Sequence, residues 1–182
     1  MTPYTVVVLA CWIVFTFVWR IAARRAKPSR KSLSLLARIG LRVGVAVAAV
    51  ALLRHHDFSV VHQTTGAVAL VGCMLCVAGV VFMLWARYSI GQNWGMPMTL
   101  RVDHELVTRG PYAFVRHPIY TGMFFTMIGT TLVVPLYLVV ALFSTVYFTV
   151  SALREEQDML AQFPAEYGAY RRRTKMFFPF LF

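Results

Sequence analysis

Two polar segments of this 182-residue chain carry side chains whose types and spacing could do chemistry. The first ends in the string Gly-Pro-Tyr-Ala-Phe-Val-Arg-His-Pro-Ile-Tyr-Thr-Gly at residues 110–122. Pro118 suits the first position of a helix, so Arg116 and His117 should lie at the N-terminus of that helix. Free backbone N–H groups beside two basic side chains would bind a carboxylate or a phosphate. The alternative is that Arg116 and His117 only meet lipid headgroups.

The second segment follows residue 153 and places acids next to tyrosines. Tyr167 and Tyr170 are three residues apart and share one face of an expected short helix. That helix, with the arginines at 171–173, could lie on anionic lipid at the membrane interface. Glu155 and Glu156 argue against this alternative, because anionic lipid repels carboxylates. A cationic partner explains the two acids better, either an arginine or the ammonium group of a ligand.

Long apolar runs must position these segments, and they exclude a water-soluble globule. Residues of the AVILMFWYC set make up 59% of the chain and charged residues 14%, against about 25% charged in soluble domains. A membrane-spanning helix needs roughly 17–25 mostly apolar residues. Pro135 separates the last two runs and predicts a tight hairpin, and Pro164 predicts a restart into the short C-terminal helix. The sequence predicts an all-α integral membrane fold with about five spanning helices, at 4–22, 39–53, 64–86, 119–134 and 136–153.

The distribution of charge decides between nucleic acid and membrane as the partner. A net charge of +11 by itself fits nucleic-acid binding. However, every basic residue except Arg54 falls in segments 20–42, 87–118 or the tail after 153, which five spans place on one side. The positive-inside rule makes that side cytoplasmic and leaves the N-terminus outside, as in a bacterial inner membrane. We expect the lipid bilayer as a partner and no nucleic acid. No acid lies within a span, which argues against transporters and pumps.

Other chemical motifs are absent or have a structural explanation. Cys11, Cys73 and Cys76 lie inside predicted spans, where cysteine packs as a small hydrophobe, so we expect no metal site. No GxGxxG or GxxxxGK[ST] string occurs, which leaves no Rossmann or P-loop nucleotide site. We therefore divide the chain into a three-span membrane region, 1–86, and a functional region, 87–182, made of a two-span hairpin with a cytoplasmic loop and tail.

The two polar motifs together resemble those of a known family. The string G-P-Y-x-x-V-R-H-P-x-Y-x-G at 110–122 is followed, after the hairpin, by Glu155-Glu156 and by F-x-x-E-Y-x-x-Y at 163–170. The segment 104–108 just upstream is also similar. This combination resembles the isoprenylcysteine carboxyl methyltransferase family and its phospholipid N-methyltransferase relatives.

The resemblance implies a membrane methyltransferase that uses S-adenosyl-L-methionine in a non-Rossmann pocket and releases S-adenosyl-L-homocysteine. Its acceptor would be hydrophobic or lipid-like and would enter from the membrane. Arg116, His117 and Glu155 would be catalytic, with Glu155 facing Arg116 and His117 across the hairpin. The residues suit this cofactor, because it carries a carboxylate, an ammonium, and a sulfonium that aromatic rings can face. The implied cofactor contacts are Gln92, His104, Glu105, Leu106, Val107, Tyr112, His117, Pro118, Tyr120, Glu155, Glu156 and Tyr167.

The sequence leaves the acceptor and two alternative functions open. Ser151 stands where the isoprenylcysteine enzymes have an arginine for the substrate carboxylate, so a carboxylate, an amine or a thiol remains possible as acceptor. A base is needed only if the acceptor begins protonated, as an amine does; a carboxylate or thiolate needs none, and His117 or a glutamate is available as the base. One alternative is an NADPH-dependent membrane reductase of the steroid or sterol type, whose C-terminal motif is similar. The other is a non-catalytic membrane protein with a basic lipid-binding tail.

Overall fold

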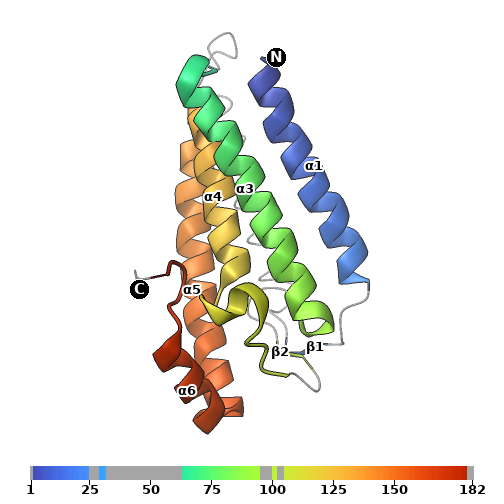
Figure 1. Cartoon of the computed structure of the whole chain (residues 1–182), viewed down its shortest axis with the longest axis vertical. Helices are drawn as coiled ribbons and strands as arrows, with labels where there is room; N and C mark the ends of the chain where they lie inside the picture. The colour runs from blue at the N-terminus through green and yellow to red at the C-terminus, as the bar shows by residue number, and fades with distance from the viewer. Residues whose placement is uncertain (1, 25–28, 32–62, 95–99, 102–104, 180–182) are drawn as a thin grey trace.

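The computed structural model describes residues 2–24, 29–31, 63–94, 100–101 and 105–179 of the chain. Within these ranges, four long helices run side by side and a short fifth helix lies at one end (Figure 1). Among the described residues, Pro3–Ala23, Gly66–Asn93 and Pro135–Gln162 are long and apolar enough to cross a membrane, and Pro118–Val133 is a shorter apolar helix. The elements are α1 (Pro3–Ala23), α3 (Gly66–Ile90), α4 (Pro118–Val133), α5 (Leu138–Gln162) and α6 (Pro164–Arg173).

These bounds confirm the helices predicted at 4–22, 64–86, 119–134 and 136–153, whereas the helix predicted at 39–53 lies outside the described residues. Two short strands, β1 (Ser29–Lys31) and β2 (Leu100–Arg101), pair antiparallel, which the sequence did not predict. Single 3₁₀ turns stand at Gly91–Asn93, Gly110–Ala113 and Pro135–Tyr137.

Glycines bring the backbones of α3 and α4 into direct contact. A Cβ atom added to Gly72 would lie 2.8 Å from the Gly129 carbonyl oxygen, and one added to Gly122 would lie 2.7 Å from that of Gly79. The two glycine pairs put the helices antiparallel and in register. Thr126 is fully buried between them and donates its hydroxyl to the Gly122 carbonyl at 2.9 Å. Small residues thus replace side-chain packing where the helices are closest, as is common between membrane helices.

The helix α1 packs on this pair through thiols and an indole. Cys11, Cys73 and Cys76 are buried free thiols within the hydrophobic core, which confirms that they pack as small hydrophobes. The Cys73 thiol donates to the Tyr4 carbonyl at 3.6 Å, and the Trp12 indole N–H donates to the Thr130 hydroxyl at 3.1 Å. Polar atoms inside the bundle are therefore paired between helices, as an apolar surrounding requires.

The last three helices carry the polar motifs. The turn at Pro135–Tyr137 joins α4 to α5 directly, which confirms the predicted hairpin. Helix α5 continues unbroken past 153 to Gln162, so Glu155 and Glu156 lie on the same helix as the apolar run. The predicted restart at Pro164 is confirmed by α6. Figure 1 shows α6 against the end of α5, with the chain after it turning back alongside the bundle.

Candidate active site

A cavity of about 490 Å³ lies where the ends of α1, α3, α4 and α5 meet α6 and the segment before α4. Its size falls within the roughly 300–1,000 Å³ typical of small-ligand sites. Carboxylate, imidazole and phenol groups line part of it, and aromatic and aliphatic side chains line the rest. The structure brings nine of the sequence-predicted residues to its wall: Glu105, Leu106, Val107, Tyr112, Arg116, His117, Tyr120, Glu155 and Tyr167.

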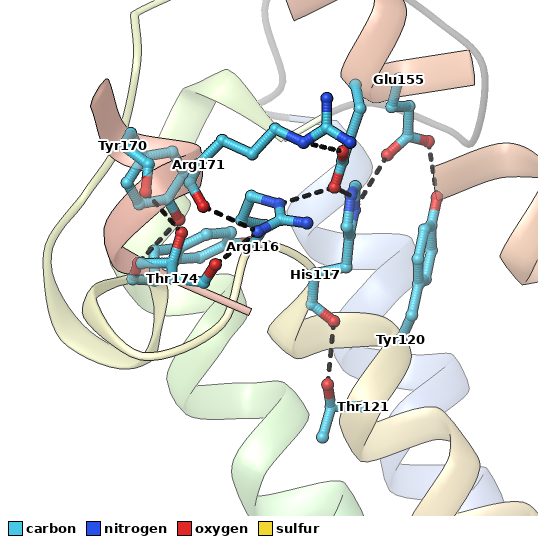
Figure 2. Close-up of polar contacts among 10 residues, drawn as sticks. Arg116, His117, Tyr120, Thr121, Glu155, Tyr170, Arg171 and Thr174 are labelled. Atoms are coloured by element: carbon cyan, nitrogen blue, oxygen red, sulfur yellow. Dashed lines mark hydrogen bonds and ion pairs between the residues drawn. The ribbon is translucent and has the colours of Figure 1, made fainter. Parts of the chain in front are cut away.

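Glu155 is held at the cavity wall by two residues of the α4 start. The Tyr120 hydroxyl donates to Glu155 Oε1 at 2.6 Å, and His117 Nδ1 lies 3.6 Å from Glu155 Oε2 (Figure 2). The His117 and Tyr120 rings stack with centroids 5.5 Å apart and an interplanar angle of 5°. Their separation of three residues puts both side chains on one helix face, toward α5. The carboxylate is therefore oriented by a short hydrogen bond and a neighbouring imidazole.

Arg116 forms a short, buried ion pair, and its partner is Glu156. Its Nε atom lies 2.6 Å from Glu156 Oε1, and the two side chains are only 8% and 4% exposed. Its Nη1 atom donates to the carbonyls of Thr174, at 2.5 Å, and Arg171, at 3.4 Å, so it also neutralises the C-terminus of α6. The expectation that Glu155 faces Arg116 is thus wrong, because adjacent residues of a helix point about 100° apart.

The start of α4 is bonded to the C-terminal segment of the chain itself. The backbone N–H of Arg116 donates to the Lys175 carbonyl at 2.8 Å, and that of His117 donates to the Met176 carbonyl at 3.1 Å. Val115 and Lys175 form a parallel bridge beside them. Two of the N–H groups expected to be free for an anion are therefore occupied. An anion at this end would depend on the His117 side chain, whose buried Nε2 lies 3.5 Å from Glu156 Oε1.

Buried tyrosines close the end of the cavity at α6. Burial raises the pKa of Tyr112, of Tyr167 and of Tyr170 well above the ordinary phenol value, so all three hydroxyls stay protonated. The Tyr170 hydroxyl donates to the Tyr112 carbonyl at 2.6 Å. The Tyr167 and Tyr170 rings meet edge to face, with centroids 5.8 Å apart, which confirms that they share one face of the helix.

Among the described residues, three predicted cofactor contacts do not line the cavity. Gln92 is exposed, since the turn that follows α3 points it outward. Pro118 is buried as the first residue of α4, where it shapes the backbone rather than the cavity surface. Glu156 is buried at 3% exposure behind Arg116. His104 lies outside the described residues.

The sequence reasoning missed the contribution of α1 and of the α5 interior. Phe15 and Trp19 of α1 line the cavity, and the Trp19 ring meets that of Trp94 edge on, with centroids 6.2 Å apart. Tyr147 and Phe148 line it from α5. The four-residue spacing of Phe15 and Trp19, which puts two large aromatics on one helix face, was the available signal. The other described residues that line the cavity are Ile90, Asn93, Trp94, Ile119, Met123, Asp158, Met159 and Tyr170.

These features define the class of protein: a helical membrane bundle with a ligand cavity at one end of its spans. The cavity is walled by an R-H-P-x-Y motif and by a helix that carries two adjacent glutamates. The sequence model of the isoprenylcysteine carboxyl methyltransferase (ICMT) family matches residues 67–162, which is more than half of the chain. The chain belongs to this family, and it is an integral membrane protein.

Individual relatives agree with this assignment. The chain is 33% identical over 115 residues to the protein-S-isoprenylcysteine O-methyltransferase of Saccharomyces cerevisiae, covering 60% of this chain and 48% of that one. It is 37% identical over 70 residues to the methanethiol S-methyltransferase of Crocosphaera subtropica, covering 38% and 28%. The structure of the eukaryotic intramembrane Ras methyltransferase ICMT superposes with a TM-score of 0.55 and 31% identity, over 61% of this chain and 42% of that one.

A third relative is named for metal resistance. The nickel-cobalt-cadmium resistance protein NccN of Alcaligenes xylosoxydans xylosoxydans is 34% identical over 147 residues, covering 78% of this chain and 64% of that one. Within the described ranges, no group of three or more His, Cys, Asp or Glu side chains is placed to hold a metal ion. The chain spans less than two thirds of the length of each of these relatives.

Proposed function

We propose that this protein is an S-adenosyl-L-methionine-dependent methyltransferase acting on a hydrophobic or lipid-like acceptor. The observation that carries the proposal is the Glu155 carboxylate, fixed at the cavity wall by Tyr120 and His117 and surrounded by aromatic rings. Membership of the ICMT family also supports a methyltransferase function. The names of the relatives, which act on isoprenylcysteine and methanethiol, extend the candidate acceptors to a carboxylate or a thiol, and an amine remains a third class.

The residues at the cavity suit the three charged groups of this cofactor. Glu155 would hold the ammonium group. His117, at the cavity wall, would donate to the carboxylate in place of the 3.5 Å contact between its Nε2 and Glu156 Oε1. The faces of Tyr112, Tyr120 and Trp94 would attract the sulfonium through cation–π interactions. When bound, the cofactor supplies an activated methyl group for in-line displacement.

The protein itself would contribute alignment and exclusion of water. The apolar part of the cavity, between α1, α4 and α5, would hold the acceptor, with Phe15, Met123 and Phe148 as its walls. Bringing two reactants together in a water-poor site supplies several kcal/mol, up to about 7–11 in ideal geometry. A carboxylate or thiolate acceptor needs no base, whereas a protonated amine would pass its proton to His117 or Glu155. Arg116, paired with Glu156, would position His117 rather than touch the reactants.

We also propose the topology that goes with this chemistry. The N-terminus would lie outside a bacterial inner membrane, with the cavity and the C-terminus on the cytoplasmic side and no role for nucleic acid. The acceptor would enter laterally from the bilayer. Residues 87–182 would form the methyltransferase core and residues 1–86 the supporting membrane region, although Phe15 and Trp19 of that region also line the cavity.

Binding measurements on the purified full chain test the proposal. S-adenosyl-L-homocysteine should bind, and Glu155→Gln and His117→Ala should each weaken binding about tenfold or more, since each removes a charge-assisted hydrogen bond. Glu166→Gln is the matched control, because Glu166 is exposed and is not among the residues that line the cavity. Binding of NADPH without S-adenosyl-L-homocysteine would instead support the reductase. Binding of neither would support a non-catalytic protein. Radiolabelled cofactor offered with carboxylate, amine and thiol acceptors would then identify the substrate.

A further inference from the structure

The last turn of α6 and the segment that follows it combine exposed cations with buried aromatic rings. We call residues 171–178 the C-terminal wedge. Arg172, Arg173 and Lys175 are exposed, and none of them forms an ion pair with an acid of the described ranges. Two to six residues further on, Phe177 is buried and Phe178 is half-buried against the bundle. The wedge thus changes from cationic to apolar within a few residues.

The contacts of its aromatic end fix the depth of the wedge. The Phe177 ring meets that of Phe124 edge on, with centroids 5.0 Å apart, and the Phe178 ring meets that of Phe125 at 5.8 Å. Phe124 lies six residues into α4, roughly 9 Å from the start of that apolar helix at 1.5 Å per residue. With the start of α4 taken as the edge of the apolar layer, the aromatic end would reach the depth of lipid acyl chains, and the cations just before it would lie at the depth of the headgroups.

The cations have a local explanation that accounts for only part of them. Basic residues in the last turn of a helix interact favourably with its dipole, which suits all three arginines of α6. Arg171 also lies 3.4 Å from Glu156 Oε2. Lys175, however, follows the end of the helix and is exposed beside the aromatic pair. Cations at headgroup depth next to inserted aromatic residues are the arrangement that anionic lipid surfaces attract.

The wedge is physically continuous with the cofactor cavity. Its backbone carbonyls at Lys175 and Met176 accept the N–H groups of Arg116 and His117, and the Phe177 carbonyl accepts the Thr121 hydroxyl at 2.5 Å (Figure 2 shows the neighbouring Arg116 contacts). The helix before it supplies Tyr167 and Tyr170 to the cavity wall. Holding the wedge in place therefore holds α6 over the cavity.

We propose that the C-terminal wedge binds the anionic phospholipid headgroups of the leaflet it enters, and that this binding keeps α6 closed over the cavity. The second half rests on the proposed function, since it makes cofactor affinity depend on the lipid. The rate of amide hydrogen exchange at Arg116 and His117 measures directly whether the wedge is bound to the start of α4, because these two N–H groups donate to the wedge. The measurement needs no cofactor.

The test uses the full chain in nanodiscs of phosphatidylcholine, with and without about 30% phosphatidylglycerol. We expect phosphatidylglycerol to slow exchange at Arg116 and His117 by about fivefold or more, the effect of one cation meeting an anionic surface. The triple substitution R172Q/R173Q/K175Q should abolish that slowing. The control R20Q/R24Q/R109Q removes as many exposed cations outside the wedge and should keep it.

Three results would overturn the inference: no effect of phosphatidylglycerol on the native chain, an equal effect in the wedge variant, or an equal effect of inorganic phosphate in phosphatidylcholine discs. The last would show an anion site rather than a membrane contact. In the same discs, S-adenosyl-L-homocysteine should bind several-fold tighter with phosphatidylglycerol in the native chain only. Lipid-dependent exchange without any binding of S-adenosyl-L-homocysteine would reject the proposed function and leave the lipid contact standing.

Discussion

The middle and the start of α4 are held by opposite kinds of interaction. Along its middle, Gly122 and Gly129 let α4 touch α3 backbone to backbone, without any charged group. At its start, Arg116 and His117 are fixed by the buried Glu156 carboxylate and by the carbonyls of the C-terminal segment. Inside a membrane, association relies on close van der Waals contact and interhelical hydrogen bonds. At the membrane edge, directional polar groups can be held in one geometry, which is what a binding site requires.

Arg116→Ala should have the largest effect on this contrast. It leaves the Glu156 carboxylate buried without its main partner, and breaking such a pair costs about 3–5 kcal/mol. The unfolding free energy in detergent would measure the loss. The double variant Arg116→Met with Glu156→Leu should recover much of it, because an apolar pair of similar volume leaves no charge uncompensated. A double variant as unstable as Arg116→Ala would show that the carbonyl contacts to α6, and not the ion pair, hold this end.

Gly79→Ala should disrupt the glycine contact between α3 and α4. The new methyl group would meet the Gly122 carbonyl, and backbone cannot move aside as a side chain can. Overpacking of this kind costs about 1–3 kcal/mol, again measured as unfolding free energy. Val81→Leu is the control, since Val81 is exposed on the same helix and the substitution adds bulk toward lipid. Equal stability of the two variants would mean that the helices separate readily and that the glycine contact contributes little.

Tyr170→Phe should cost less, about 1–2 kcal/mol, because it leaves the Tyr112 carbonyl without its hydrogen bond. This substitution weakens only the polar contacts near the start of α4 and leaves the glycine contact between α3 and α4 intact. Exchange of amides in α6 should speed up while amides of α3 stay protected. Loss of protection in both helices would show that the polar region at α6 and the glycine contact between α3 and α4 unfold as one unit.

Alkaline pH should have the smallest effect. The folded pKa of Tyr170 is raised by burial, so the folded state keeps its proton when the unfolded chain loses it near pH 10. The corresponding stability is present below that pH and is lost as the pH rises above it. Between pH 9 and pH 11 the native chain should lose roughly 1 kcal/mol more unfolding free energy than Tyr170→Phe. If the unfolding free energies of the native chain and of Tyr170→Phe depended on pH in the same way, the Tyr170 hydroxyl would be in contact with water.

Local signals explain which features could be predicted from the sequence. Pro118, Pro135 and Pro164 mark helix boundaries wherever they occur, because the ring fixes φ and removes an N–H donor, and all three boundaries were found. Apolar runs gave the helices around them. Nine cavity residues were also predicted, since their motifs lie in two short stretches of chain.

Features that depend on the meeting of distant segments were missed. The use of the Arg116 and His117 N–H groups by residues 175–176 needs the chain to return over about sixty positions, which no local pattern reveals. Phe15 and Trp19 reach the cavity only because α1 packs on α3. The glycine contact likewise needs both helices in register, although the seven-residue spacing within each helix was visible.

The sequence alone determined the apolar helices, their proline boundaries and the presence of two adjacent glutamates beside a basic motif, because each of these is set by nearby residues. Only the tertiary structure decided their roles. Successive helical side chains point about 100° apart, so Glu156 turns to Arg116 and becomes part of the scaffold, while Glu155 turns to Tyr120 and the cavity. The rotation of α5 against α4, which packing sets, made that division.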